Sequence, residues 1–375
     1  MKQYLYIFPV TVFLSLCAAC TQADIVVPTA GDGEGGGSTE KGTPLSVKNL
    51  GLSVEIESRS IVTGGPSGDA ANPNPLTTVG LCVTKQSSSG AVSVYASGNN
   101  TQVFTYNSLA SPAAWQLAEG EEQLLLHSDK GTVYAFSPVG KSVSLAGTPK
   151  VPDMSSIKVL DKQKFYFNDG DTPVDASTDV QWETDQDDYL YALAKDQLVD
   201  RWHPEVSLTM KHALTKVSFR VLEAEGGTAF SGHRVKQVVL KSVDGFKKCT
   251  SAKLNIATGE LSGTLTVVDQ LTFLAGGDQR AIGAADDATK VPVQAFGLVI
   301  PVTGVPVTLE LTLDDGRIFL MSPSEGSADP GTFTADWLKG NNYIYNIRMS
   351  PQGIEIADIQ VAGWGEGGST DVPVE

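Results

Sequence analysis

The chain has 375 residues, of which 41% are hydrophobic and 19% charged, so it can form a packed core and is long enough for two domains. Its formal net charge of −16 argues against nucleic-acid binding and against docking of a protein surface on anionic lipid headgroups. The 38 glycines and 19 prolines are typical of many short strands joined by turns.

The first twenty residues have the pattern of an export signal. A short positive start precedes an apolar run over residues 4–16, which is too short to span a bilayer. The run ends in LCAAC, where Ala18 and Ala19 precede Cys20 as in a bacterial lipobox. We predict a lipoprotein signal peptide over residues 1–19 and a lipid anchor on Cys20. An ordinary cleaved signal with incidental cysteines is the alternative.

A glycine-rich stretch over residues 20–44 predicts a flexible tether. The following segment LSVEIES predicts a half-buried strand, because its apolar and polar residues alternate. Arg59 then stands between two serines. It is either the solvated corner where the strand ends or a place where a protease cuts the chain.

Strand patterns continue along the chain without any sustained helical period. The segments TVGLCVTK, GTVYAFSP and DYLYALA form a first series, and LTKVSFRV, YIYNIRM and GIEIADIQVAGW belong to a second. TLELTLDDGRIFL predicts a hairpin with an Asp-Gly turn, and TADWLKG predicts one helical turn. In GIEIADIQVAGW the phase slips between Ile356 and Ile359, which predicts a bulge or turn at Ala357–Asp358. The spacing favours two β-sandwiches, over residues 45–205 and 206–375.

No pattern of catalytic or metal-ligating residues stands out. The four histidines lack a nucleophile or metal-site spacing, and the acidic runs lack EF-hand spacing, so we predict no enzyme, no metal and no cofactor. Cys82 and Cys249 are expected to be buried free thiols. The tryptophans could form a glycan platform but are more often core residues: Trp115, Trp182, Trp202 and Trp337.

An ordered series of segments carries a resemblance to a known family. Trp115 is followed by GTVYAFSP, DYLYALA, LTMKHALTKVSFRV, GLVIPV, LTLDDGRIFL, WLKGNNYIYNIRM and IADIQVAGW. Together with the lipobox, this series resembles the fimbrillin (Mfa-like) family, the subunits of type V pili. The resemblance covers most of the chain, from about Leu50 to Trp364.

The resemblance implies an all-β protein with two tandem transthyretin-like β-sandwich domains. It implies a palmitate-type lipoprotein on the cell outer membrane that becomes part of a fimbrium and supports cell adhesion. An Arg-specific maturation protease would remove the N-terminal strand, and other pilus subunits would then add a strand by donor-strand exchange. The family also contains tip, anchor and accessory members. The alternative role is therefore a non-polymerising surface lipoprotein that acts as a tip adhesin, an anchor, or a module for a host or glycan receptor.

Site residues follow from this mechanism. The displaced strand would carry four apolar anchors: Leu50, Leu52, Val54 and Ile56. The cut would fall between Arg59 and Ser60, because cuts at Lys41 or Lys48 leave the alternating strand in place. The donor strand would be the C-terminal one, with Ile354, Ile356, Ile359, Val361 and Trp364. The alternative is that this segment is simply the last strand of its own domain.

Overall fold

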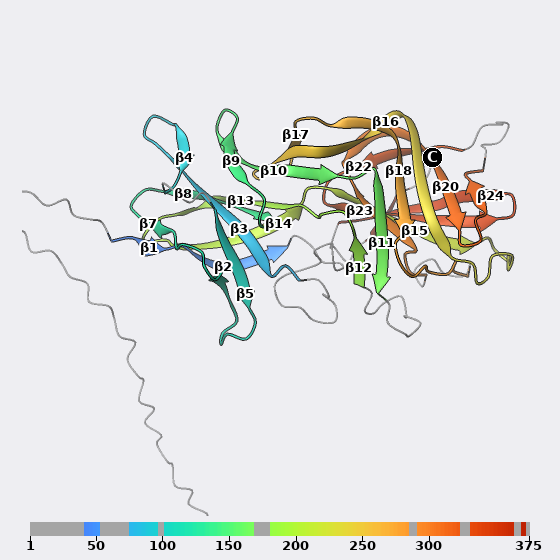
Figure 1. Ribbon diagram of the computed structural model, residues 1–375, viewed down its shortest axis with the longest axis horizontal. Helices are drawn as coiled ribbons and strands as arrows, with labels where there is room; N and C mark the ends of the chain where they lie inside the picture. The colour runs from blue at the N-terminus through green and yellow to red at the C-terminus, as the bar shows by residue number, and fades with distance from the viewer. Residues whose placement is uncertain are drawn as a thin grey trace, which may run out of the picture. The chain divides into compact units, whose positions relative to one another are not determined.

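The computed structural model describes seven stretches of the chain: residues 41–52, 75–96, 101–168, 181–284, 291–322, 331–363 and 369–372. These residues form strands and turns, with no helix among them (Figure 1). None of the described residues therefore forms a helix that could cross a membrane. The prediction of an all-β fold is confirmed.

The first sheet has eight strands in the order β2-β14-β13-β8-β3-β5-β6, with β4 paired to β3. Its strands are β2 (Ser46–Leu52), β3 (Thr78–Gln86), β4 (Val92–Val94), β5 (Gln102–Asn107), β6 (Ala114–Leu117), β8 (Gly131–Ser137), β13 (Leu190–Val199) and β14 (Glu205–His212). All neighbours are antiparallel except β2 and β14, which run parallel. Beside this sheet, β1 (Thr43–Pro44) pairs with β7 (Leu125–Leu126).

The second sheet has ten strands built around the long strand β16 (Val235–Asn255). Strand β16 pairs with β18 and β20 up to Lys248, and from Cys249 onwards it pairs with β10 and β17. The other strands are β9 (Val143–Ala146), β10 (Val151–Val159), β11 (Lys162–Asn168), β12 (Gln181–Thr184), β17 (Leu261–Ser262), β18 (Thr266–Ala275), β20 (Val302–Leu313), β21 (Ile318–Leu320) and β22 (Phe333–Trp337).

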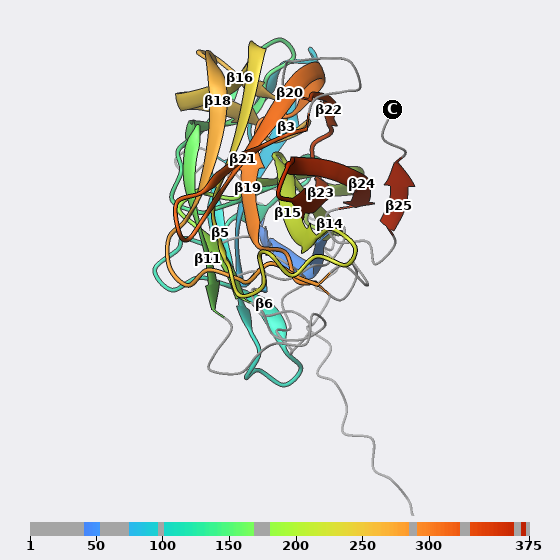
Figure 2. The ribbon, with the colours of Figure 1, turned by 90° about the vertical axis from the view of Figure 1, so that its right-hand side faces the viewer.

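The third sheet has five strands in the order β19-β15-β23-β24-β25. They are β15 (Thr215–Glu223), β19 (Ala295–Val299), β23 (Asn341–Ser350), β24 (Gly353–Gly363) and β25 (Ser369–Val372). Figure 2 shows β24 between β23 and β25 near the C-terminus. The expected division at residue 205 falls at the start of β14, which pairs in the first sheet, whereas β10 and β11 pair with strands that follow residue 206.

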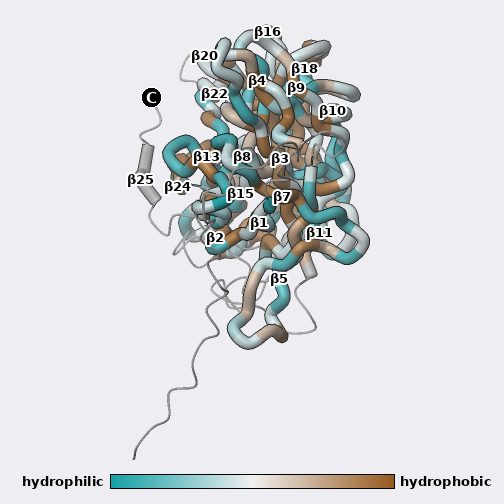
Figure 3. The backbone as a smooth tube through the Cα atoms, turned by 90° about the vertical axis from the view of Figure 1, so that its left-hand side faces the viewer, coloured by the Kyte–Doolittle hydropathy of each residue, from teal (hydrophilic) through white to brown (hydrophobic). Residues whose placement is uncertain are grey.

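Hydrophobic and hydrophilic stretches are interleaved through the described part of the chain (Figure 3), and the buried side chains form two clusters. One cluster lies on one face of the first sheet, and the other includes residues of all three large sheets. Strand β3 contributes to both, because Leu81 and Val83 enter one cluster and Cys82 the other. Cys82 and Cys249 are both buried free thiols, as predicted, and burial raises the pKa of Cys82 to about 12.

Two local predictions had opposite outcomes. The predicted hairpin is present: β20 pairs with β21 across Gly316, whose φ of 87° suits the Asp-Gly turn. The helical turn predicted for TADWLKG is wrong, because Phe333–Trp337 form strand β22. Phe333, Ala335 and Trp337 alternate into the core while the residues between them are exposed, so burial with a period of two overrides local helix propensity.

The predicted bulge in the last long strand is confirmed at Ala357. Asn346 lies opposite Asp358 and Ile347 lies opposite Ile356, so Ala357 has no counterpart on β23. This extra residue resets the phase of the strand. Four aliphatic residues therefore face the same side of β24 despite their uneven spacing: Ile354, Ile356, Ile359 and Val361.

Deleting Ala357 should change the free energy of unfolding by no more than about 1 kcal/mol, because Ile356 and Ile359 are then two positions apart and the four aliphatic residues still face the core. Deleting Gln360, which lies opposite Ile344, is the contrasting control, because it makes Ile359 and Val361 neighbours and turns one of them away from the core, at a cost of about 1.5–3 kcal/mol. Urea unfolding followed by circular dichroism measures both changes. A loss of stability on deleting Ala357 as large as that on deleting Gln360 would contradict the role of Ala357 as the extra residue of a bulge.

Candidate strand-exchange site

Strand β2 is the edge strand of the first sheet, and β14 is the only strand in the described part of the chain with which it forms a ladder. The pairing runs from Ser46 opposite Glu205 to Leu52 opposite Met210. The Ser46 amide also donates a hydrogen bond of 2.9 Å to the Pro204 carbonyl. A single parallel ladder thus joins β2 to the sheet, so removal of β2 would expose the edge of β14.

The side chains of β2 and of the residue before it anchor the strand in the first core cluster. Leu45, Val47 and Leu50 are buried, and Leu52 is half-buried against the same cluster. Lys48 is the extra residue of a bulge, because Val47 pairs with Val206 while Asn49 pairs with Ser207. The bulge lets Lys48 point into solvent, where it lies 3.8 Å from Glu205.

This geometry agrees only partly with the residues expected for the displaced strand. Leu50 and Leu52 lie in β2 as expected, whereas Val54, Ile56, Arg59 and Ser60 lie outside the described residues, as does Cys20. The sequence analysis missed two anchors, Leu45 and Val47. Leu45 and Val47 are two residues apart and directly precede the polar pair Lys48-Asn49, and this spacing is the sequence signal that could have identified them.

The expected donor strand, β24, lies in the third sheet. It pairs along its full length with β23 and along Ile359–Ala362 with β25. Ile354 is 1% exposed, whereas Ile356, Ile359 and Val361 are partly buried; Trp364 lies outside the described residues. The monomer therefore uses β24 as a strand of its own sheet.

The other face of β24 is polar and is held by side-chain hydrogen bonds. Arg220 donates to Gln360 at 2.9 Å, and Asn346 donates to Asp358 at 2.8 Å. Burial lowers the pKa of the Arg220 guanidinium, and the Asp358 carboxylate opposes that shift. Release of β24 would break these contacts as well as its ladder with β23.

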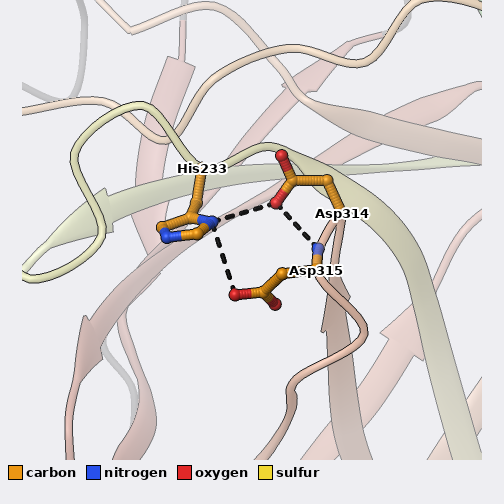
Figure 4. A group of neighbouring side chains, drawn as sticks. All are labelled: His233, Asp314 and Asp315. Atoms are coloured by element: carbon orange, nitrogen blue, oxygen red, sulfur yellow. Dashed lines mark hydrogen bonds and ion pairs between the residues drawn. The ribbon is translucent and has the colours of Figure 1, made fainter.

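A cluster of two carboxylates and one histidine lies at the β20–β21 turn (Figure 4). Asp314 and Asp315 belong to the turn, whereas His233 is far from them in the sequence. His233 Nδ1 lies 3.0 Å from Asp314 Oδ1 and 3.5 Å from Asp315 Oδ2. The hydrogen bond with His233 lowers the pKa of the Asp314 carboxyl. Arg317 donates to Asp315 at 2.6 Å, so the turn already balances the charge of Asp315 with a guanidinium.

The remaining candidates from the sequence have mixed environments. His212 is buried with its Nδ1 3.0 Å from an Asp188 carboxylate oxygen, as a structural histidine would be. Trp115 and Trp337 are core residues. Trp202 is 59% exposed, whereas the side chain of Trp182 lies outside the described residues.

Comparison with known proteins identifies the class of the fold. A model of the fimbrillin-like family matches residues 74–364, which is more than half of the chain. The chain therefore belongs to the fimbrillin-like family. Membership indicates a non-enzymatic subunit of a pilus or adhesion structure at the cell surface. A search of curated proteins gave no match.

Solved structures of low sequence identity are also similar to this chain. A fimbrial protein from Bacteroides vulgatus has 14% identity and a TM-score of 0.44, with 85% of this chain and 99% of that chain covered. The tip fimbrial protein Mfa3 from Porphyromonas gingivalis has 10% identity and a TM-score of 0.36, with 84% and 99% covered.

The packing of β2 can be tested by mutation. Leu50→Ala should lower the free energy of unfolding by about 2–5 kcal/mol, because it leaves a cavity beneath the edge strand. Lys48→Ala is the matched control two residues away, with an expected change within about 0.5 kcal/mol because its side chain is exposed. Urea unfolding measures both. Equal effects from the two variants would contradict the burial of β2.

Proposed function

We propose that this chain is a structural pilus subunit that assembles by proteolysis-triggered donor-strand exchange and supports cell adhesion. The observation that carries the proposal is the position of β2. It is an N-terminal edge strand, joined to the described part of the sheet by one ladder, and its buried side chains belong to the core. Its loss would leave both an unpaired edge and an apolar groove, which together fit an extended segment of another chain.

The energies support such a switch. Leu45, Val47 and Leu50 together contribute about 5–9 kcal/mol of burial. Domains are stable by only about 5–15 kcal/mol, so a subunit without β2 would be close to unfolding. Any fitting strand would bind strongly. While β2 remains attached, its high effective concentration outcompetes donors, so the uncut precursor stays monomeric.

The proposed cut between Arg59 and Ser60 separates the whole of β2 from the rest of the chain. Lys41 precedes β2, so cleavage there leaves the strand attached. Lys48 lies within β2, so cleavage there leaves Leu50 and Leu52 on the main body. In this proposal the precursor is held at the outer membrane by a lipid on Cys20, and an Arg-specific protease releases the strand.

The proposed donor is the C-terminal strand of another subunit, either a copy of this chain or a related one. The aliphatic face of β24 provides four anchors, as many as β2 and the residue before it provide together: Ile354, Ile356, Ile359 and Val361. Donation requires β24 to leave β23 and exchange its own sheet for the groove on β14. Because of the bulge at Ala357, the acceptor must take up an extra residue or pair with only half of the donor.

Treatment of the purified precursor with an Arg-specific protease should give a new N-terminus at Ser60, ladders on a non-denaturing gel and fibres in electron micrographs. These results are expected because removal of β2 leaves the edge of β14 unpaired, and a donor strand from another subunit can pair with it. A synthetic peptide of residues 44–58, added in excess during cleavage, should occupy the groove and suppress the ladders.

Arg59→Ala is the control for this experiment and should stay monomeric under the same treatment. Cleavage at the expected bond that yields only stable monomers would contradict the polymer role and leave a tip or anchor subunit.

A second candidate function is a non-polymerising tip adhesin, anchor or ligand-binding module on the surface. The pairing of β24 on both sides favours it, because this strand is already satisfied within its own chain. The polar contacts of Arg220 and Asn346 hold β24 further in place.

A reversible lock distinguishes the two functions. Arg348 and Glu355 lie opposite each other on β23 and β24 and are exposed, so the double change Arg348→Cys/Glu355→Cys should form a disulfide. If β24 is donated, the oxidised variant should fail to polymerise after cleavage and should recover on reduction. Arg348→Cys alone is the control. Equal polymerisation of the oxidised and reduced forms would show that β24 stays in its own sheet.

A further inference from the structure

Trp202 is a large aromatic residue exposed at the turn between β13 and β14. It is 59% exposed, in contrast to the core tryptophans Trp115 and Trp337. The Arg201 guanidinium carbon lies 4.2 Å from the centroid of the Trp202 ring. An exposed apolar ring and a half-buried cation stacked on it thus lie together at this turn.

The turn that carries Trp202 is held firmly by a buried carboxylate. Asp200 Oδ1 accepts hydrogen bonds from the amides of Trp202 and His203 at 2.9 and 2.8 Å. The Arg201 amide donates to the His127 carbonyl at 2.9 Å, which ties the turn to the segment after β7. The exposed ring therefore stands on an ordered backbone, so little conformational freedom is lost when it binds.

This turn lies at the end of the sheet where the N-terminal segment enters. Ser46, the first residue of β2, bonds to Pro204 in the turn, and Pro44 pairs with Leu125 just before His127. Leu125 is a second exposed apolar side chain at this end, where β1 and β7 lie side by side (Figure 1). Thr43, near the start of the described residues, pairs with Leu126 and therefore lies at the same end of the sheet as the turn of Trp202.

We propose that the surface formed by Trp202, Arg201 and Leu125 contacts the headgroup region of the bilayer to which the precursor is anchored. The inference rests on the lipidation of Cys20 in the proposed function. The twenty residues between Cys20 and Lys41 reach at most about 70 Å, so the anchor confines this end of the sheet near the bilayer. Under such confinement a weak contact is enough to orient the subunit.

The chemistry of the surface fits zwitterionic lipids. Tryptophan prefers the boundary between water and hydrocarbon, and an arginine beside it can reach the phosphates. The nearby Asp129 is neutralised by Lys85 at 2.7 Å. The net charge of −16 disfavours a strongly anionic bilayer, so the contact depends on the indole ring rather than on long-range attraction.

The orientation has a consequence for maturation. Strand β2 runs from Ser46 at the bilayer end to Leu52, about 20 Å further on. The chain thus leaves β2 at the end that points away from the lipid. A protease in solution approaches that end without interference from the membrane.

The test uses the full-length lipidated protein in vesicles of phosphatidylcholine and phosphatidylethanolamine that contain chain-brominated phosphatidylcholine. Bromine should quench part of the tryptophan emission of the wild type, and most of that quenching should be lost in Trp202→Ala. Flotation on a density gradient measures anchoring independently. Circular dichroism of the variant should match the wild type, because Trp202 is exposed.

A relocated tryptophan is the matched control. Leu109 is 95% exposed in the turn after β5. Thr105 of β5 pairs with Thr78 at the start of β3, whereas Lys85 at the other end of β3 pairs with Gly131 of β8. Trp202→Ala/Leu109→Trp should show no quenching above Trp202→Ala.

Three outcomes would overturn the inference. If all proteins float with the vesicles, equal quenching of the wild type and Trp202→Ala would show that Trp202 does not contact the bilayer. Quenching of the relocated tryptophan would contradict the proposed orientation. Failure of the wild type to float would overturn the lipid anchor together with the inference, which separates this result from the other two.

Discussion

The parallel ladder between β2 and β14 is the contact on which the proposed behaviour of this protein depends. It is made at a sheet edge, and its side chains reach the same cluster that stabilises the rest of the first sheet. A strand in the middle of a sheet could not leave without breaking two ladders. A purely polar edge strand could leave without consequence. Strand β2 combines one ladder with a buried apolar face, and this combination makes its removal both feasible and costly to the fold.

The alternation of side chains between the two faces of a strand is the second constraint, and it shows which features of the fold can be predicted from the sequence. The spacing of Ile356 and Ile359 predicted a bulge or turn at Ala357–Asp358, because two side chains three positions apart cannot lie on one face of a regular strand. Val47 and Leu50 have the same spacing around the bulge at Lys48. That signal is weaker than the regular alternation from Leu52 onwards, so sequence reasoning omits the first two anchors, Leu45 and Val47.

The all-β class, the Asp-Gly hairpin and the family could be predicted because each has a local or ordered sequence signature. The partners of β11 and the meeting of His233 with Asp314 could not, because strand pairing between distant segments leaves no local pattern. The misassigned TADWLKG segment has the same cause. Its helix-forming residues are placed in a strand by the core that covers Phe333 and Trp337.

The parallel pairing of β2 also determines when the fold can be completed. Ser46 pairs with Glu205, so the strand is synthesised long before its partner exists. Until β14 has followed, the buried face of β2 has no place in a core, and closing so long a loop is slow. Strand β2 is therefore among the first elements to be synthesised and among the last to be able to dock. A chain of this kind needs protection from premature association until β14 has been made.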